Sequence, residues 1–162
     1  MVHPLRMSPA EREFHRKAAT HCFNQAWDLM VMKDRSAAED SQLLHLAHTS
    51  RYHWGLVGGP RQRAVSDWQL SRVYAALHEP RLAVKFARSC LGASRRHRLR
   101  VVEETAYEAL ARAYATSKDY RRARKCLDRA QTMLDKLDVD EEDRKIFQGQ
   151  LSDTRAMIKT SL

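Results

Sequence analysis

Apolar residues recur along this chain with the spacing of amphipathic helices. Between Phe14 and Met30 they stand three or four residues apart, and a second such run extends from Leu43 to Trp54. No segment shows a convincing alternation of apolar and polar residues, which would indicate a half-buried strand. The pattern therefore predicts an all-α protein.

Capping residues predict where the helices begin and end. Ser8 and Ser36 are each followed three residues later by a glutamate, which is the arrangement of a capping box. A Gly58-Gly59-Pro60 break ends the second helix, and Asp138 is expected to cap the last one. We predict about seven helices in a single domain over residues 8–160, after a flexible N-terminus at 1–7. Three antiparallel hairpins cover about 9–57, 61–93 and 99–137, and a solvating cap helix covers about 139–160.

Two segments of the chain match when the sequence is displaced by 40 residues. Leu70, Tyr74 and Ala83 then coincide with Leu110, Tyr114 and Ala123, and several basic residues coincide as well. A fixed period indicates repeated helical units, none of which buries its apolar face alone, so that neighbouring units must stack. Such stacks usually bind partners rather than catalyse reactions.

The two units resemble tetratricopeptide repeats. The second has Tyr107, Leu110, Ala111 and Tyr114 on its first helix and Ala123 where its second helix crosses the first. The resemblance covers about residues 64–132, and the period is longer than the usual 34 of that family. It implies a right-handed α-solenoid of stacked hairpins. The strings at 23–29 and 50–54 also resemble a bacterial group of such proteins, a likeness that implies no particular activity.

The resemblance also implies which face binds a partner. In tetratricopeptide proteins the first helix of each hairpin lines a concave groove, and here this predicts Trp68, Arg72, Glu108 and Arg112 as partner-binding residues. Arg72 and Arg112 hold equivalent places in successive repeats, so that their guanidinium groups would form a row that clamps carboxylates. The alternative is that each arginine pairs with a nearby acid, as Glu108 would with Arg112 four residues on.

The charge of the chain leaves a second kind of partner open. Lys and Arg number 29 against 20 Asp and Glu, a formal net charge of +9. Two helices have basic residues in equivalent positions, which would form a ridge on the convex face able to follow a phosphate backbone. No known nucleic-acid-binding signature accompanies them, and a solvated face is the simpler interpretation. The residues of this ridge are Arg81, Lys85, Arg88, Arg121, Lys125 and Arg129.

Catalytic motifs are lacking in the sequence. There is no H-E-x-x-H, no phosphate-binding Gly-Lys-Ser/Thr and no G-x-S-x-G. His45 and His48 share a helical face, and a metal-dependent helical-bundle enzyme would need His15, His21 or another ligand to converge on them. The three cysteines form no C-x-x-C pair, which favours buried, reduced thiols. Neither a cofactor nor a metal is expected.

Together these observations predict a non-enzymatic, cytoplasmic protein–protein interaction module. It would bind an acidic peptide or protein segment in its concave groove, with self-association through the terminal hairpins as a further prospect. The alternatives are a nucleic-acid-associated or regulatory protein that uses the basic ridge, and the metal-dependent enzyme. No apolar run is long enough to predict a membrane span.

Overall fold

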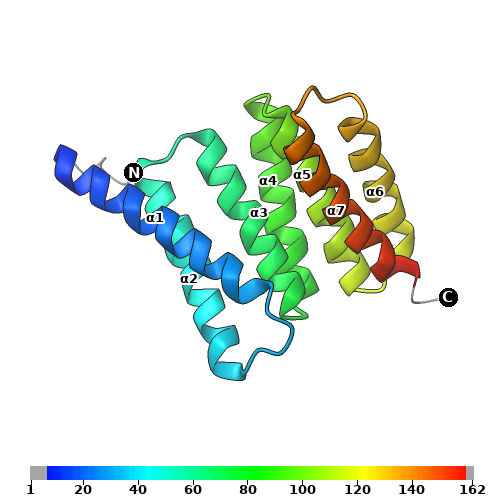
Figure 1. Ribbon diagram of the computed structural model, residues 1–162, viewed down its shortest axis with the longest axis horizontal. Helices are drawn as coiled ribbons and strands as arrows, with labels where there is room; N and C mark the ends of the chain where they lie inside the picture. Colours follow the sequence, from blue (N-terminus) through cyan, green and yellow to red (C-terminus); the bar gives the residue numbers. More distant parts are fainter. Residues whose placement is uncertain (1–6, 160–162) are drawn as a thin grey trace.

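The protein is all-helical over residues 7–159, the part of the chain that the computed structural model describes (Figure 1). Most of the N-terminal segment predicted to be flexible lies outside these residues. The helices, in chain order, are α1 (Pro9–Met30), α2 (Ala37–Val57), α3 (Pro60–Ala76), α4 (Pro80–Arg96), α5 (Arg100–Thr116), α6 (Tyr120–Leu134) and α7 (Glu141–Lys159). None of these helices is long and apolar enough to cross a membrane.

Consecutive helices pack against one another in a solenoid-like stack. The pairs α1–α2, α3–α4 and α5–α6 form the predicted hairpins, and α4 also packs on α5. The odd-numbered helices α3 and α5 touch each other, whereas α4 and α6 are separated by α5 (Figure 1). The predicted fold class is therefore confirmed.

Three similar turns explain the 40-residue period. His78, Arg98 and Lys118 lie 20 residues apart, and each has a left-handed backbone with φ between 56° and 59°. In each turn the next residue donates a backbone hydrogen bond to the carbonyl five residues earlier, which is the Schellman termination of a helix. Each of the helices α3, α4 and α5 with its turn thus takes 20 residues, and the repeat of two helices takes 40.

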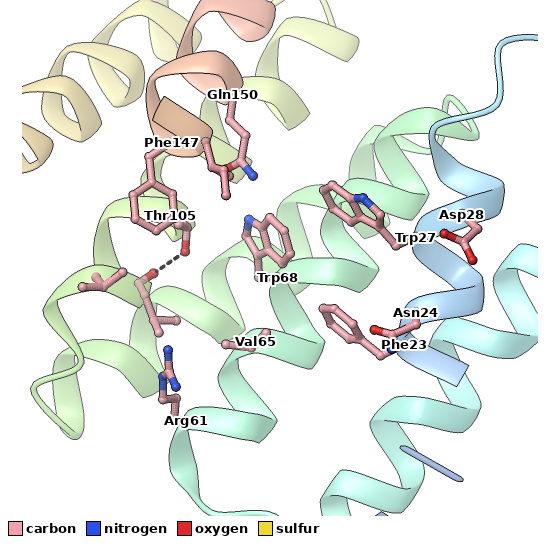
Figure 2. Close-up of a pocket in the computed structure, with 13 residues that line it drawn as sticks. Phe23, Asn24, Trp27, Asp28, Arg61, Val65, Trp68, Thr105, Phe147 and Gln150 are labelled. Atoms are coloured by element: carbon pink, nitrogen blue, oxygen red, sulfur yellow. Dashed lines mark hydrogen bonds between the residues drawn. The ribbon is translucent and has the colours of Figure 1, made fainter. Parts of the chain in front are cut away.

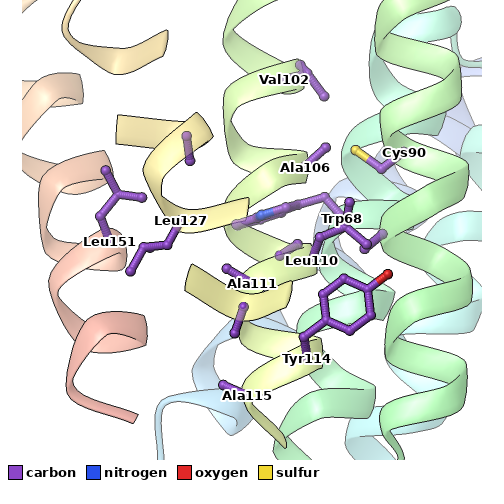
Figure 3. Close-up of a cluster of buried hydrophobic side chains, with 14 of the residues drawn as sticks. Trp68, Cys90, Val102, Ala106, Leu110, Ala111, Tyr114, Ala115, Leu127 and Leu151 are labelled. Carbon is purple, nitrogen blue, oxygen red and sulfur yellow. The ribbon is translucent and has the colours of Figure 1, made fainter. Parts of the chain in front are cut away.

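The core combines tyrosines with small residues, as the repeat predicts. Tyr74 and Ala83 are buried in one hydrophobic cluster, while Tyr114 and Ala123 are buried in a second one (Figure 3). Alanine at the crossing point lets the two helices approach closely, and the tyrosine fills the space beside it. Burial of these equivalent pairs ties the sequence repeat to packing.

Helix α7 packs on α5 and α6 rather than serving only as a solvated cap (Figure 1). Leu151 and Ile158 are buried in the same cluster as Leu127 of α6. The helix is capped by Asp140, whose Oδ1 accepts a hydrogen bond from the backbone N–H of Asp143 at 2.8 Å. The cap predicted at Asp138 is therefore wrong, because the helix begins two residues later than expected.

Candidate binding groove

A groove runs along the face formed by the odd-numbered helices. One hollow of about 450 Å³ is lined by residues of α1, α3, α5 and α7 (Figure 2). A second hollow of about 500 Å³ adjoins it and contains Arg72. The two share Trp27, Ile146 and Gln150, so that they form one continuous concave surface, which we call the α1–α7 groove.

Two stacked tryptophans form the apolar centre of the α1–α7 groove. The rings of Trp27 and Trp68 are nearly parallel, with centroids 5.8 Å apart. The guanidinium carbon of Arg72 lies 5.6 Å from the Trp27 ring and 5.4 Å from the Trp68 ring, within cation–π range of both. Phe23 and Val65 extend the apolar lining on the other side of this pair (Figure 2).

Polar and charged side chains surround the apolar centre of the α1–α7 groove. The indole nitrogen of Trp68 is buried and has no hydrogen-bond partner among the described residues. Arg61 is exposed and forms no ion pair with any residue in the range 7–159. Figure 2 shows that Arg61 and Asp28 lie at opposite ends of the lining. The first hollow therefore has an apolar floor with Arg61 and Asp28 as its charged groups, and the adjoining hollow adds Arg72, Lys145 and Asp153.

Glu108 is the centre of a buried ionic network beside this floor. Its side chain is 1% exposed and accepts hydrogen bonds from Arg72 Nη1 at 3.0 Å and from Arg112 Nε at 3.1 Å. Thr154 of α7 donates a third hydrogen bond to Glu108 Oε1 at 2.5 Å. One carboxylate thus joins α3, α5 and α7, and two positive charges share it.

Burial dominates the electrostatics of this network. Burial lowers the pKa of Arg72, while the facing carboxylate of Glu108 acts in the opposite direction. Glu104, one helical turn before Glu108, is also buried, and neither of its carboxyl oxygens has a hydrogen-bond partner. Burial, with a smaller contribution from Glu108, raises the pKa of Glu104 to about 8. Glu104 is therefore mainly protonated at neutral pH.

The four residues predicted to bind a partner divide into two groups. Trp68 and Arg72 line the α1–α7 groove. Glu108 and Arg112 instead contact Thr154 and Met157, because α7 packs over this part of α5. Arg112 pairs with Glu108, as in the alternative that the sequence left open.

The groove also contains residues that the sequence analysis did not assign to it. Trp27 comes from α1, and Ile146 and Phe147 come from α7. Ile146 is 51% exposed, which makes it the large apolar side chain of α7 that is most open to solvent among the described residues. Phe23 and Trp27 stand four residues apart and so lie on one face of a helix. This spacing is the sequence signal from which an aromatic surface on the first helix could have been predicted.

The described histidines and cysteines do not assemble a metal site. Among residues 7–159, no three His, Cys, Asp or Glu side chains are grouped closely enough to hold a metal ion. His48 hydrogen-bonds the hydroxyl of Tyr74 at 2.8 Å, and the Nδ1 atoms of His15 and His53 lie 2.7 Å apart. All three cysteines are free, and burial raises the pKa of Cys90 to about 12.

The six residues of the predicted basic ridge lie on α4 and α6, and all of them are exposed. None of them lines the α1–α7 groove. The basic ridge and the groove are thus separate surfaces of the molecule.

Comparison with known proteins identifies no relative of this chain. The chain matches no protein-family model, and no curated protein or solved structure has significant similarity to it. Its function therefore has to be argued from its own geometry.

Proposed function

We propose that the protein is a non-enzymatic, cytoplasmic interaction module that binds an acidic peptide or protein segment in the α1–α7 groove. The observation that carries this proposal is the stacked pair of Trp27 and Trp68 in the lining of the α1–α7 groove. Its resemblance to tetratricopeptide repeats, which bind peptides on this face, is consistent with the proposal.

The apolar floor would supply most of the affinity. Aromatic side chains bury a large area with little loss of conformational freedom, and they are enriched among the residues that dominate binding energy. The volume of each hollow lies within the range of natural ligand sites, about 300 to 1,000 Å³. A large apolar side chain of the partner would lie against Trp27 and Trp68.

The polar groups would set the orientation and the charge preference of the partner. A partner carboxylate would lie next to Arg61, which forms no ion pair with any residue that the structure describes. Arg72 is held by Glu108 and acts by shaping the floor rather than by clamping an anion.

The test is a selection of binding peptides from a displayed random library, followed by calorimetry on the individual peptides. We expect the selected peptides to combine an acidic residue with a large apolar one. Ile146→Asp should abolish their binding without unfolding the protein, because Ile146 is half exposed. Tyr52→Asp, at a site that is 63% exposed on α2, is the matched control and should leave the affinity unchanged.

A charge reversal then tests the predicted contact with Arg61. Arg61→Glu should weaken the acidic peptides and should strengthen versions in which lysine replaces their acidic residue. Equal loss of affinity in Ile146→Asp and Tyr52→Asp, or a selected set without acidic residues, would contradict the proposal.

A further inference from the structure

The net positive charge of the protein is concentrated on two helices. Helices α4 and α6 together carry ten Lys and Arg residues and one acidic residue, Asp128, which gives a net +9. This equals the formal net charge of the whole chain, so the remaining residues have 19 cations and 19 anions and are neutral. All ten cations are exposed. They are Arg81, Lys85, Arg88, Arg95, Arg96, Arg121, Arg122, Arg124, Lys125 and Arg129.

Two tyrosines of α5 organise part of this charge between α4 and α6. The ring of Tyr107 has the guanidinium carbons of Arg95 and Arg129 at 5.4 and 5.9 Å from its centroid. Its hydroxyl also accepts a hydrogen bond from Arg95. One tyrosine thus holds an arginine from α4 and an arginine from α6.

Tyr114 repeats the same arrangement. Its hydroxyl accepts a hydrogen bond from Arg88 Nη2 at 3.1 Å, and the guanidinium carbon of Arg122 lies 4.7 Å from its ring centroid. The two Arg–Tyr–Arg sets are seven residues apart on each of the three helices. Seven residues of helix correspond to about 10 Å, so the sets form two steps of a ladder.

Side chains of α4 and α6 meet over the tyrosines of α5. Helices α4 and α6 both pack on α5 but not on each other (Figure 1). A hollow of about 480 Å³ lies beside Tyr107 on the α6 side of this strip. Its other lining residues all belong to α6 and include one acid: Lys125, Cys126, Asp128, Arg129 and Thr132. We call this strip, with Tyr107 and Tyr114 beneath it and α4 and α6 at its sides, the basic furrow.

We propose that the basic furrow binds the phosphate backbone of a single-stranded nucleic acid. Eight of the ten cations are arginines, whose planar guanidinium groups bind phosphate through two hydrogen bonds and stack on bases. Contact with the tyrosines restricts four of these arginines before any ligand arrives, which reduces the entropy lost on binding. Arg95 also pairs with Glu103 at 3.2 Å and Arg122 with Asp119 at 2.6 Å, so at these two arginines a phosphate would compete with an exposed ion pair of low strength. The repeated steps suit a partner whose negative charges also repeat along a chain.

Other anionic partners fit the basic furrow less well. A membrane surface would be bound more strongly with exposed apolar side chains beside the cations. The exposed large apolar residues of the described chain are Phe14, Val31, Met32, Tyr52 and Ile146, and none of them lies on α4 or α6. An acidic protein segment would offer carboxylates without bases to stack on the arginines.

The proposal is tested by the fluorescence anisotropy of a labelled oligothymidylate titrated with the full chain at several salt concentrations. The furrow variant replaces one arginine of each contact by glutamine: Arg88→Gln, Arg95→Gln, Arg122→Gln and Arg129→Gln. The control removes the same number of exposed charges from α1 and the segment after it: Arg12→Gln, Arg16→Gln, Lys17→Gln and Lys33→Gln. Circular dichroism of each variant shows whether it is folded.

The expected result is a loss specific to the furrow variant. If its four arginines each neutralise one phosphate, the slope of log K against log salt should fall in magnitude by about 3, since each contact contributes about 0.7 for a single strand. We expect its Kd to rise at least about tenfold at low salt, with the control within about twofold of wild type. A variant with lysine at the same four positions keeps the charge, and its Kd should lie between those of wild type and the glutamine variant. Lysine lacks the planar set of N–H donors with which arginine binds phosphate through two hydrogen bonds.

Several results would overturn the proposal. Equal losses in the furrow and control variants would mean that net charge alone attracts the oligonucleotide. Tighter binding of a duplex of the same length, of vesicles containing phosphatidylserine or of polyglutamate would assign the basic furrow to that partner instead. Failure of wild type to bind at low salt would also refute it. Ile146→Asp leaves the basic furrow unchanged, so the result is independent of peptide binding in the α1–α7 groove.

Discussion

Replacing Glu108 by glutamine tests the buried network that joins three helices. The carboxylate is 1% exposed and is shared by Arg72 and Arg112, whose side chains are 11% and 16% exposed. Glutamine has nearly the same shape, so that the change removes the charge and leaves the packing. Two buried guanidinium groups would then lack their counter-charge. Removing one partner of a buried ion pair typically costs about 3 to 5 kcal/mol.

Urea unfolding followed by circular dichroism measures this loss. We expect Glu108→Gln to lower the unfolding midpoint with little change in the slope m, because the unfolded chain is unaffected. Glu13→Gln is the matched control: Glu13 is 53% exposed and pairs with Arg16 and Lys17 at 3.8 Å, so its loss should cost less than about 0.5 kcal/mol. A loss below about 1 kcal/mol for Glu108→Gln would refute the reasoning.

A double variant shows whether α7 takes part in the same network. Thr154→Val removes the hydrogen bond to Glu108 and keeps the size of the side chain. If α7 is held through Glu108, the losses of Glu108→Gln and Thr154→Val should not add, and the coupling free energy should exceed about 0.5 kcal/mol. Strict additivity would mean that α7 is bound only through its apolar contacts.

The remaining predictions concern stability in three other places. The pKa of Glu104 is raised from 4.5 to about 8, so between these pH values the folded protein retains a proton that the unfolded chain releases. The free energy of unfolding should therefore fall by a few kcal/mol as the pH rises from 4.5 to 8. Glu104→Gln should remove most of the corresponding fall in the urea midpoint. Tyr114→Ala should cost about 3 to 5 kcal/mol by leaving a cavity, and Ala123→Trp should destabilise by overpacking; unchanged melting temperatures in both would contradict the stacked core. Lys118→Gly should raise the melting temperature, because the left-handed backbone at this residue costs a side chain with a Cβ about 1 to 2 kcal/mol, and a lower melting temperature would contradict this.

Local sequence signals predict where most of the helices begin. The capping boxes at Ser8 and Ser36 both form, and the helices they begin start one residue later. The break after the second helix is also explained locally, since a Cβ at Gly58 would lie 2.6 Å from the carbonyl oxygen of Trp54. Helix α4 ends at Arg96, three residues after the end predicted at about 93. Gly92 does not end the helix, because no residue between Gly92 and Arg96 interrupts it.

The position of α7 was harder to predict from the sequence. Its acidic first turn suggested a solvated cap, but Phe147, Leu151, Thr154 and Ile158 stand three or four residues apart and form a stripe. Three of these four residues are buried and Phe147 is half-buried. The stripe indicates that α7 packs on a neighbour, yet not on which one. The contacts of Glu108 and Arg112 with α7 are therefore tertiary information that the repeat pattern does not contain.

The two isoleucines allow the most direct test of the proposed function. Ile146 lines the α1–α7 groove and is 51% exposed, while Ile158, on the same helix, is 3% exposed in the core. In a protein labelled with ¹³C at the isoleucine methyl groups, titration with a selected acidic peptide should shift the Ile146 resonance and leave that of Ile158 in place. An unmoved Ile146 resonance at saturating peptide would contradict binding in the α1–α7 groove.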